Sequence, residues 1–293
     1  MNQKGGVGKT TCTVNLGAAL AARKKRVLLI DLDAQANLSL HLGIEAQRLQ
    51  HSTYSVLTSR SSLREAVRLE VRPGLSVVPA NLDLAGAEIE LVNVVGRETI
   101  LRAALGRFLE TEPFDYVLID CPPSLGLLSL NGLLTASEVF IPLQTEFFAL
   151  QGMSRLLDVV TLIRDRLAHP VEITGIIPTL HDVRTNLSRE VVSEIRRYFG
   201  SKVFRAIIHS SVKLAESPSH GKTIFEYAPS SKGAKDFDKL AKEVLKQEPQ
   251  APASVFPPSP ARVVAPPPAD APGRTADFLG ETPRASTAPG PLS

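Results

Sequence analysis

Tryptophan is absent from this chain of 293 residues, and aromatic residues make up only 5% of it. A platform that stacks the bases of single-stranded nucleic acid on aromatic rings is therefore disfavoured. Only two cysteines are present, Cys12 and Cys121, which excludes a disulfide framework and a four-cysteine zinc site. The sequence has no apolar run of the ~18–20 residues that span a membrane, and no secretory signal opens it. We expect a cytoplasmic protein without a membrane partner.

Neither sign of charge is in large excess. Lys and Arg number 33 against 30 Asp and Glu, so the formal net charge of +3 does not by itself indicate a nucleic-acid partner. Proline is unevenly distributed, because 12 of the 22 prolines lie between Pro249 and Ser293. Such a segment buries too little apolar surface to offset its ordering entropy. We predict a globular domain over 1–248 and a disordered tail over 249–293, which is either a solvated extension or a partner-docking segment.

Short apolar runs alternate with helical patterns within the predicted domain. Several of the runs are continuous in Val, Ile and Leu, as in strands that are buried on both faces. The predicted strands are Arg26–Asp31, Leu75–Ala80, Asp115–Asp120, Glu138–Leu143, Glu172–Thr179 and Phe204–Ile208. Strands that alternate with helices indicate an α/β fold with a mostly parallel sheet flanked by helices.

A glycine-rich loop near the N-terminus is the strongest functional signal. Glycines let consecutive backbone N–H groups surround phosphate oxygens, and the helix predicted over Thr11–Ala22 would direct its N-terminal dipole at the same anion. In this pattern a lysine reaches the β- and γ-phosphates and the next hydroxyl binds Mg²⁺. The predicted phosphate-binding residues are Lys4, Gly5, Gly6, Val7, Gly8, Lys9, Thr10 and Thr11. The general pattern has a glycine where this chain has Gln3, and Lys4 directly precedes the two glycines.

Aspartates stand at the ends of two predicted strands. Asp31 and Asp33 end one apolar run, and Asp120 ends another. Ligands of open α/β sheets gather at the carboxyl ends of the strands. A carboxylate at that edge can hold Mg²⁺-bound water or orient an attacking water, as phosphoryl transfer requires. We therefore predict that these acids complete the phosphate site.

These residues resemble the ParA/Soj partitioning ATPases, the deviant Walker A family that is related to MinD. The resemblance covers residues 2–247. It rests on Lys4–Thr11, Asp31–Asn37, Asp120–Gly126, Val212–Lys222 and Ser231–Lys235. It implies a P-loop ATPase with weak intrinsic activity that uses ATP and Mg²⁺ and dimerises on ATP. It further implies non-specific binding to double-stranded DNA on the nucleoid, stimulation of hydrolysis by a ParB-type DNA-bound partner, and segregation of a chromosome or plasmid.

The resemblance also assigns roles to residues. Lys4 would be the signature lysine that reaches the partner's nucleotide, Lys9 the phosphate lysine and Thr10 a Mg²⁺ ligand. Asp33 would position the attacking water, and Asp120 would be the acid that completes the metal site. The stretch near the adenine would include Pro218. The DNA-binding candidates are Lys213, Lys232 and Lys235, with Arg189 and Arg196 as weaker ones.

Two departures from the family accompany the resemblance. Family members have a central strand directly before the loop, whereas Met1-Asn2-Gln3 precede Lys4 here, so the first central strand is missing. We expect translation to begin upstream; the alternative is a natural truncation that leaves the protein inactive. The segment His209–Lys213 has Ser210 and Lys213 where the family often has arginines, which implies weaker DNA binding.

Two alternative functions remain open. A MinD-like membrane-cycling ATPase would end in a basic amphipathic helix, whereas this chain ends in a Pro- and Ala-rich segment. A scaffold or positioning protein could keep the fold without cycling on DNA. An iron–sulfur reductase is disfavoured, because Cys12 and Cys121 are expected to be packing residues.

Overall fold

The computed structural model describes residues 1, 4–146 and 154–247. Its strands are β1 (Val27–Asp31), β2 (Arg68–Arg72), β3 (Leu75–Val78), β4 (Tyr116–Asp120), β5 (Glu138–Gln144) and β6 (Glu172–Thr179). Its longer helices are α1 (Lys9–Ala21), α6 (Ile100–Leu109), α7 (Leu127–Thr135), α8 (Ser154–Leu167), α9 (Asn186–Phe199) and α12 (Lys232–Lys246). Its shorter ones are α2 (Asn37–His41), α3 (Thr53–Leu57), α4 (Leu63–Ala66), α5 (Ala87–Glu90), α10 (Val212–Glu216) and α11 (Ile224–Tyr227). The predicted α/β class is confirmed.

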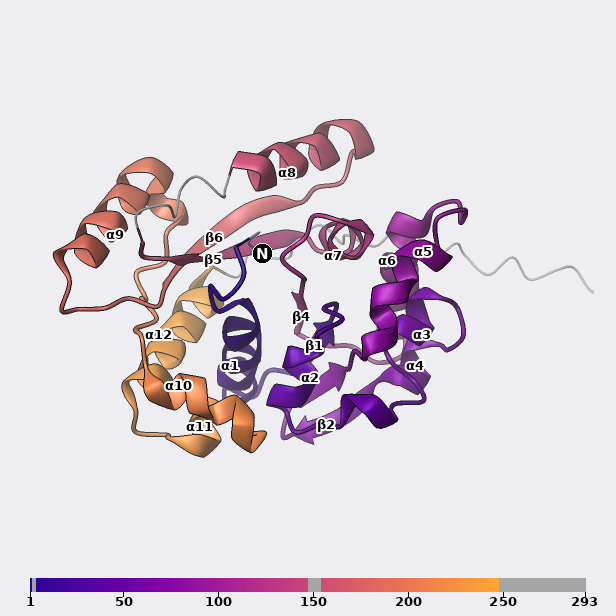
Figure 1. The fold of residues 1–293 in the computed structure, drawn as a ribbon, viewed down its shortest axis with the longest axis horizontal. Coiled ribbons are helices and arrows are strands. Elements are labelled where there is room, and N and C mark those ends of the chain that lie inside the picture. The colour runs from indigo at the N-terminus through magenta and orange to yellow at the C-terminus, as the bar shows by residue number, and fades with distance from the viewer. Residues whose placement is uncertain (2–3, 147–153, 248–293) are drawn as a thin grey trace, which may run out of the picture. The chain divides into compact units, whose positions relative to one another are not determined.

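Four strands form one sheet in the order β2-β3-β1-β4 (Figure 1). The strand β1 pairs in parallel with both β3 and β4, and its register sets Asp31 opposite Asp120. The short strand β2 pairs antiparallel with β3 at the edge. The two aspartates that end β1 and β4 therefore lie side by side at the carboxyl edge of the sheet.

Both faces of this sheet are covered, which explains the continuous apolar runs. Val27 and Leu29 of β1 join a cluster with residues of α1 and α12. Leu28 and Ile30 point to the other face and pack with residues of α3, α4 and α6. Because successive side chains of a strand alternate between faces, a strand covered on both sides must be apolar throughout.

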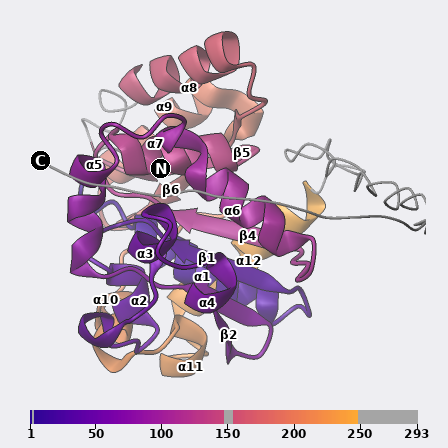
Figure 2. The ribbon, with the colours of Figure 1, turned by 90° about the vertical axis from the view of Figure 1, so that its right-hand side faces the viewer.

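The strands β5 and β6 form a separate parallel pair. Figure 1 shows α8 on one side of this pair and α1 and α12 on the other, and the apolar clusters agree, since residues of α8 pack on one face and those of α1 and α12 on the other. Figure 2 shows the same layers from the side. The sheet expected from the sequence is thus divided into two parts that share the layer formed by α1 and α12.

The predicted strand Phe204–Ile208 was wrong as a regular strand. Isolated bridges, Val203 with Ile176 and His209 with His181, flank this segment. Within it, Phe204 N–H donates to Ile176 O and Ile208 N–H donates to Pro178 O, both at 2.9 Å. Between them, the amides of residues 205 and 206 donate to the Glu243 carboxylate of α12 at 2.7 Å each. A side chain therefore satisfies donors that a sheet ladder would otherwise use.

The strand β2 was missed. Its residues are mostly exposed and alternate charged with apolar side chains, and Pro73 and Gly74 follow it before β3. Gly74 has φ +72°, a conformation that favours glycine in a tight hairpin turn. The alternation of charged and apolar residues, followed by Pro73 and Gly74, was the signal in the sequence that could have predicted this strand.

Two expectations concern the ends of the chain. The tail 249–293 lies outside the described residues. In the described part of the chain no strand stands directly before the glycine loop, and Met1 is not in a strand. No helix among the described residues is long and apolar enough to cross a bilayer.

A glycine in β6 offers a test of the packing between β6 and the segment that follows α9. A Cβ on Gly175 would lie 2.3 Å from Cε2 of Phe204 and 2.8 Å from Cδ1 of Phe140, and the two rings themselves are in edge contact at 5.2 Å. We expect Gly175→Ala to lower the free energy of unfolding by about 1–3 kcal/mol, since overpacking strains the core. Urea denaturation measures this. The matched control is Gly86→Ala, where nothing lies within 4 Å; an equal loss in both variants would contradict the packing argument.

Candidate nucleotide site

The glycine loop lies open in front of α1. Gly6 and Gly8 have φ of +73° and +87°, which non-glycine residues rarely adopt, and Gly8 is the residue that precedes the helix. A Cβ on Gly5, Gly6 or Gly8 would meet no atom within 4 Å. The loop therefore leaves its inner side accessible to a bulky anion, with the N-terminus of a helix of 13 residues directly behind it.

Lys9 and Thr10 occupy the first positions of α1 and face the acids of the sheet. The Thr10 hydroxyl donates a hydrogen bond of 2.6 Å to Oδ2 of Asp120. The Lys9 ammonium donates to the Lys4 carbonyl at 3.3 Å. Burial lowers the pKa of Lys9, while the nearby carboxylates of Asp120 and Asp33 act to raise it. The sequence-predicted residues Lys9, Thr10, Asp33 and Asp120 are thus brought together.

Asp120 is almost completely buried, with 2% of its surface exposed. Burial raises its pKa to about 6, the Thr10 hydrogen bond opposes the shift, and the Asp33 charge adds to it. A carboxylate kept in this position at the cost of desolvation is suited to a cation, which would lower its pKa again.

Asp31 has a different environment from its neighbour Asp33. Asp31 is fully buried and accepts hydrogen bonds from the backbone and hydroxyl of Ser39 at 3.0 and 2.8 Å. Burial, with the Asp120 charge next, raises its pKa to about 7. Asp33 is only half-buried, and its Oδ1 accepts from the Gln35 amide at 3.0 Å. Asp31 therefore fixes the strand end to α2, whereas Asp33 retains an accessible carboxylate.

These residues fit a Mg²⁺-nucleotide. A hydroxyl and a carboxylate, those of Thr10 and Asp120, stand together beside a loop with space for phosphates. No group of three or more His, Cys, Asp or Glu side chains among the described residues could hold a metal alone. Mg²⁺ usually keeps several waters and binds through one or two protein oxygens plus substrate phosphates, so the sparse donor set matches this ion.

Lys4 is turned toward its own chain. Its ammonium forms an ion pair of 2.8 Å with Glu146, and both side chains are about half exposed. Exposed pairs of this kind contribute about 0.2–1 kcal/mol. The pair therefore restrains Lys4 only weakly.

Pro218 belongs to a different element. It is the second residue of the short 3₁₀ helix Ser217–His220, which packs against α2, and its carbonyl accepts from the Gly221 amide at 3.0 Å. Among the described residues no backbone hydrogen bond joins it to the glycine loop. Its predicted place near the adenine remains a prediction.

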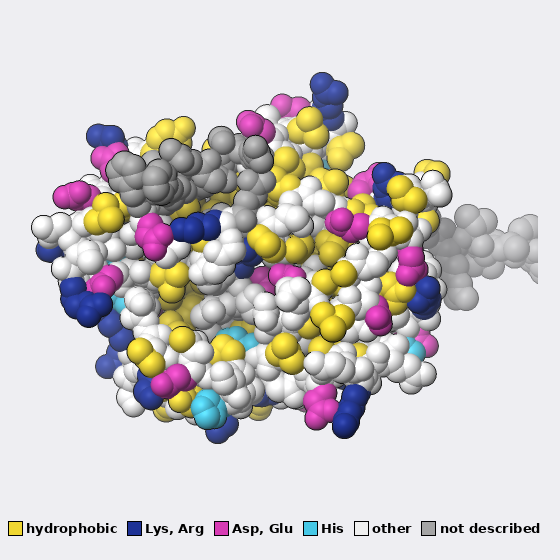
Figure 3. All heavy atoms as spheres, in the orientation of Figure 1, with side chains coloured by type: hydrophobic (Ala, Val, Ile, Leu, Met, Phe, Trp, Pro, Cys, Tyr) yellow, Lys and Arg dark blue, Asp and Glu magenta, His cyan; other side chains and the backbone are white. Residues whose placement is uncertain are grey.

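The basic residues predicted for DNA lie on the elements after β6. Gly233 at the start of α12 packs against Leu214 of α10, so Lys213 and Lys232 come from adjacent elements. Lys235 is exposed on the next turn of α12. Dark-blue side chains gather at the lower left of Figure 3, where Figure 1 places α10 and α12.

Arg189 on α9 is electrostatically linked to the same region. Burial and the charges of His209, Lys232 and Arg189 lower the pKa of His181, against the opposing charge of Asp182. Lys213 is partly neutralised by an ion pair of 2.9 Å with Glu216. Arg196, which lies on α9 with Arg189, donates a hydrogen bond to the Arg205 carbonyl at 3.5 Å.

Two contacts of the site were not foreseen from the sequence. Glu146 pairs with Lys4, and the Thr179 hydroxyl at the end of β6 donates to the Val7 carbonyl at 2.9 Å. Thr179 thus ties the glycine loop to the second sheet. Thr179 ends one predicted strand and Glu146 follows another, and this place at the carboxyl edge was the signal that could have identified them.

The hydroxyl of Thr10 gives a direct test of the site. We expect Thr10→Val to weaken Mg²⁺-dependent ATP binding by at least about tenfold, since it removes a ligand oxygen and leaves Asp120 without its donor. Thr10→Ser should keep the affinity. Calorimetric titration with and without Mg²⁺ separates the metal-dependent part. Thr13→Val is the matched control, because that hydroxyl bonds only to the Lys9 carbonyl of its own helix, at 3.1 Å; a comparable loss there would refute the assignment.

Known proteins are similar to this chain in both sequence and fold. The model of the AAA domain family matches residues 1–173. The sporulation initiation inhibitor protein Soj of Bacillus subtilis is 46% identical over 243 residues, which cover 83% of this chain and 95% of Soj. The chromosome partitioning protein ParA of Caulobacter vibrioides is 44% identical over 247 residues, covering 84% and 92%.

A solved structure agrees with these relatives. The cobyrinic acid a,c-diamide synthase of Mycobacterium smegmatis, crystallised with an ATP analogue and magnesium, superposes with a TM-score of 0.73 at 36% identity, covering 84% of this chain and 92% of that one. The identity to Soj and ParA extends over most of both chains. The chain therefore belongs to the Soj/ParA family of chromosome-partitioning ATPases and is an ATP hydrolase.

Proposed function

We propose that this protein is a partitioning ATPase that dimerises on ATP, binds double-stranded DNA without sequence preference on the nucleoid, and hydrolyses ATP when a ParB-type DNA-bound partner stimulates it. The observation that carries the proposal is the grouping of Lys9, Thr10, Asp33 and Asp120 around an open glycine loop. The cargo is a chromosome or a plasmid.

The site residues divide the chemistry among them. The loop amides and Lys9 bind and orient the phosphates, and Thr10 and Asp120 hold the metal. When bound, Mg²⁺ neutralises charge that develops on the phosphate oxygens. Asp33, with its accessible carboxylate, orients the attacking water. Positioning and charge stabilisation of this kind supply most of the catalysis in phosphoryl transfer.

Dimerisation is assigned to Lys4. Its ion pair with Glu146 is exposed and weak, so Lys4 can exchange that carboxylate for the phosphates of a nucleotide on a second copy. A dimer closed on two nucleotides would form only when ATP is present.

DNA binding is assigned to Lys213, Lys232, Lys235 and Arg189. Neutralisation of phosphates suffices for non-specific affinity, and base readout is not required. The partial neutralisation of Lys213 by Glu216 makes Lys232 and Lys235 the principal contributors.

Asp33→Ala tests the catalytic assignment. We expect ATP hydrolysis to fall by about 10²–10⁴-fold while ATP binding persists, because only the orientation of the attacking water is lost. Phosphate release and nucleotide titration measure the two effects. The control is Asp165→Ala, which removes a carboxylate of α8 whose side chain is 60% exposed. Normal hydrolysis by Asp33→Ala would rule out this role.

DNA binding is tested with duplex DNA of random sequence in ATP, ADP or no nucleotide, across a salt series. We expect tight binding only in ATP, and persistence of that binding in Asp33→Ala. The double variant Lys232→Ala/Lys235→Ala should weaken it by roughly tenfold per lysine at ~0.1 M salt and reduce the salt slope by about 2. The double variant Lys239→Ala/Lys246→Ala, further along α12, is the charge-matched control. Equal binding in all three nucleotide states would contradict the proposal and favour a scaffold or MinD-like function.

A further inference from the structure

Two histidine side chains lie in contact where the chain leaves β6. The rings of His181 and His209 meet edge to face, with 5.3 Å between their centroids. Their backbones are bonded as well, since the His181 amide donates to the Ile208 carbonyl at 3.1 Å and the Ser210 amide donates to the His181 carbonyl at 3.0 Å. The pair therefore joins the end of β6 to the segment that leads into α10.

His209 is attached to α12 through a buried carboxylate. Oδ2 of Asp236 accepts hydrogen bonds from Nδ1 of His209 at 2.8 Å and from the His209 amide at 3.1 Å. The side chain of Asp236 is 4% exposed and that of His209 is 19% exposed. An ionised carboxylate only accepts hydrogen bonds, so Nδ1 carries a proton and Nε2 is the nitrogen that can take up another.

His181 is buried and its ring is incompletely bonded. Only 6% of the residue is exposed, and Nδ1 has no hydrogen-bond partner in the described part of the chain. Leu180, directly before it, has φ +52°, a left-handed conformation that is uncommon for leucine. Backbone strain and unpaired buried polar atoms are both rare in folded proteins and are found together at functional sites.

Charged groups on several elements act on the His181 ring. They come from the following loop, α9, α12 and the segment before α10, and they are Asp182, Arg189, Lys232 and His209. Burial is the largest cause that lowers the pKa of His181 below its ordinary value of about 6.5, and the charges of His209 and Lys232 come next. Asp182 opposes the shift, but it is engaged by Arg184 in an ion pair of 2.7 Å. The neutral form of His181 therefore prevails at pH 7.

A bound duplex would change this balance, because Lys232 and Arg189 are among the cations assigned to DNA phosphates. Phosphates beside these cations offset the positive charge that disfavours a proton on His181, and an opposite charge nearby favours the protonated form of a histidine. Like charges in contact repel, so the two rings share one added proton. That proton would add charge beside Ser210, where the family often has an arginine.

We propose that His181 and His209 form a proton-binding pair that couples DNA binding to pH, taking up one proton when a duplex neutralises Lys232 and Arg189. The inference rests on the proposed DNA function and deepens it. Because the complex holds more protons than the free protein, DNA affinity rises as the pH falls. The rise is confined to the range between the pKa of His181 in the free protein and its higher value in the complex.

DNA affinity measured against pH tests the coupling. Random-sequence duplex DNA is titrated between about pH 6.0 and 7.5 in a saturating non-hydrolysable ATP analogue, with the full chain and with the double variant His181→Phe/His209→Asn. Asp31 and Asp120 of the nucleotide site have pKa values of about 7 and about 6 in both proteins, so the difference between the two proteins isolates the pair. On lowering the pH, the affinity of the unmodified chain should rise about 3–10-fold more than that of the variant, since one linked proton gives at most about tenfold per pH unit.

A second measurement does not involve DNA. The imidazole resonances of His181 and His209, followed by NMR in the nucleotide-free protein, report the titration of each ring. His209→Asn can still donate to Asp236 and removes one of the charges that lower the pKa of His181, so that pKa should rise. The matched control is His51→Gln, which changes a histidine bonded to the Ser61 hydroxyl at 2.7 Å and should leave the pKa of His181 and the pH dependence of DNA binding unchanged.

The outcomes separate this inference from the function on which it rests. ATP-dependent DNA binding with the same pH dependence in the unmodified chain and in His181→Phe/His209→Asn would overturn the proton-binding pair and leave the DNA assignment intact. An unchanged pKa of His181 in His209→Asn would also overturn the pair, because the two rings would then titrate independently. Absence of DNA binding by the unmodified chain at every pH would overturn the DNA assignment together with the pair.

Discussion

The register of β1 against β4 is the constraint on which the nucleotide site depends. It sets Asp31 directly opposite Asp120, two carboxylates that are removed from water within one sheet edge. A slip of one residue would turn every side chain of one strand to the wrong face and separate the two acids. The two carboxylates have different partners: Asp31 accepts hydrogen bonds from the amide and hydroxyl of Ser39, whereas the side chain that bonds to Asp120 in the described part of the chain is the hydroxyl of Thr10.

The glycine loop is held by the two sheets together. α1 packs on β1 and on α12, and the Asn15 side chain accepts the Ile224 amide at 2.8 Å, so α1 is attached to the C-terminal elements. On the other side, Thr179 bonds to Val7 from the end of β6. The glycine loop and the start of α1 are thus bonded to the ends of β4 and β6, through Thr10 with Asp120 and Val7 with Thr179.

The same architecture places the basic side chains on elements that pack against α1. Lys232 and Lys235 begin α12, the helix that packs on α1 behind the loop. The packing of Gly233 on Leu214 brings α10 to the same place. The glycine loop, which precedes α1, and the two lysines of α12 are therefore connected through the packing of one helix pair, α1 and α12.

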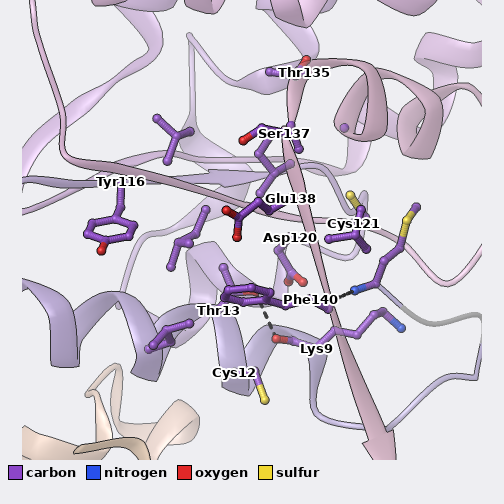
Figure 4. Close-up of a pocket in the computed structure, with 18 of the residues that line it drawn as sticks. Lys9, Cys12, Thr13, Tyr116, Asp120, Cys121, Thr135, Ser137, Glu138 and Phe140 are labelled. Carbon is purple, nitrogen blue, oxygen red and sulfur yellow. Dashed lines mark hydrogen bonds between the residues drawn. The ribbon is translucent and has the colours of Figure 1, made fainter. Parts of the chain in front are cut away.

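Most of the site could be predicted from the sequence, because local patterns specify it. Glycines before a helix predict a phosphate loop, and an aspartate after a continuous apolar run predicts an acid at a sheet edge. The sequence therefore predicted that Lys9, Thr10, Asp33 and Asp120 lie together, as the structure shows; their roles stay predictions. The strands β1, β3, β4, β5 and β6 followed from the same runs. Tertiary contacts decided the rest. The Glu243 carboxylate accepts hydrogen bonds from two amides of the segment 204–208, which a sheet ladder would otherwise use. The Lys4 ammonium bonds to Glu146, which lies 142 residues away in the sequence. Only the folded chain shows that residues of β4 and β5 line one cavity (Figure 4) and that Thr179 bonds to Val7, because contacts between elements distant in the sequence depend on their arrangement in space and leave no periodicity in the sequence.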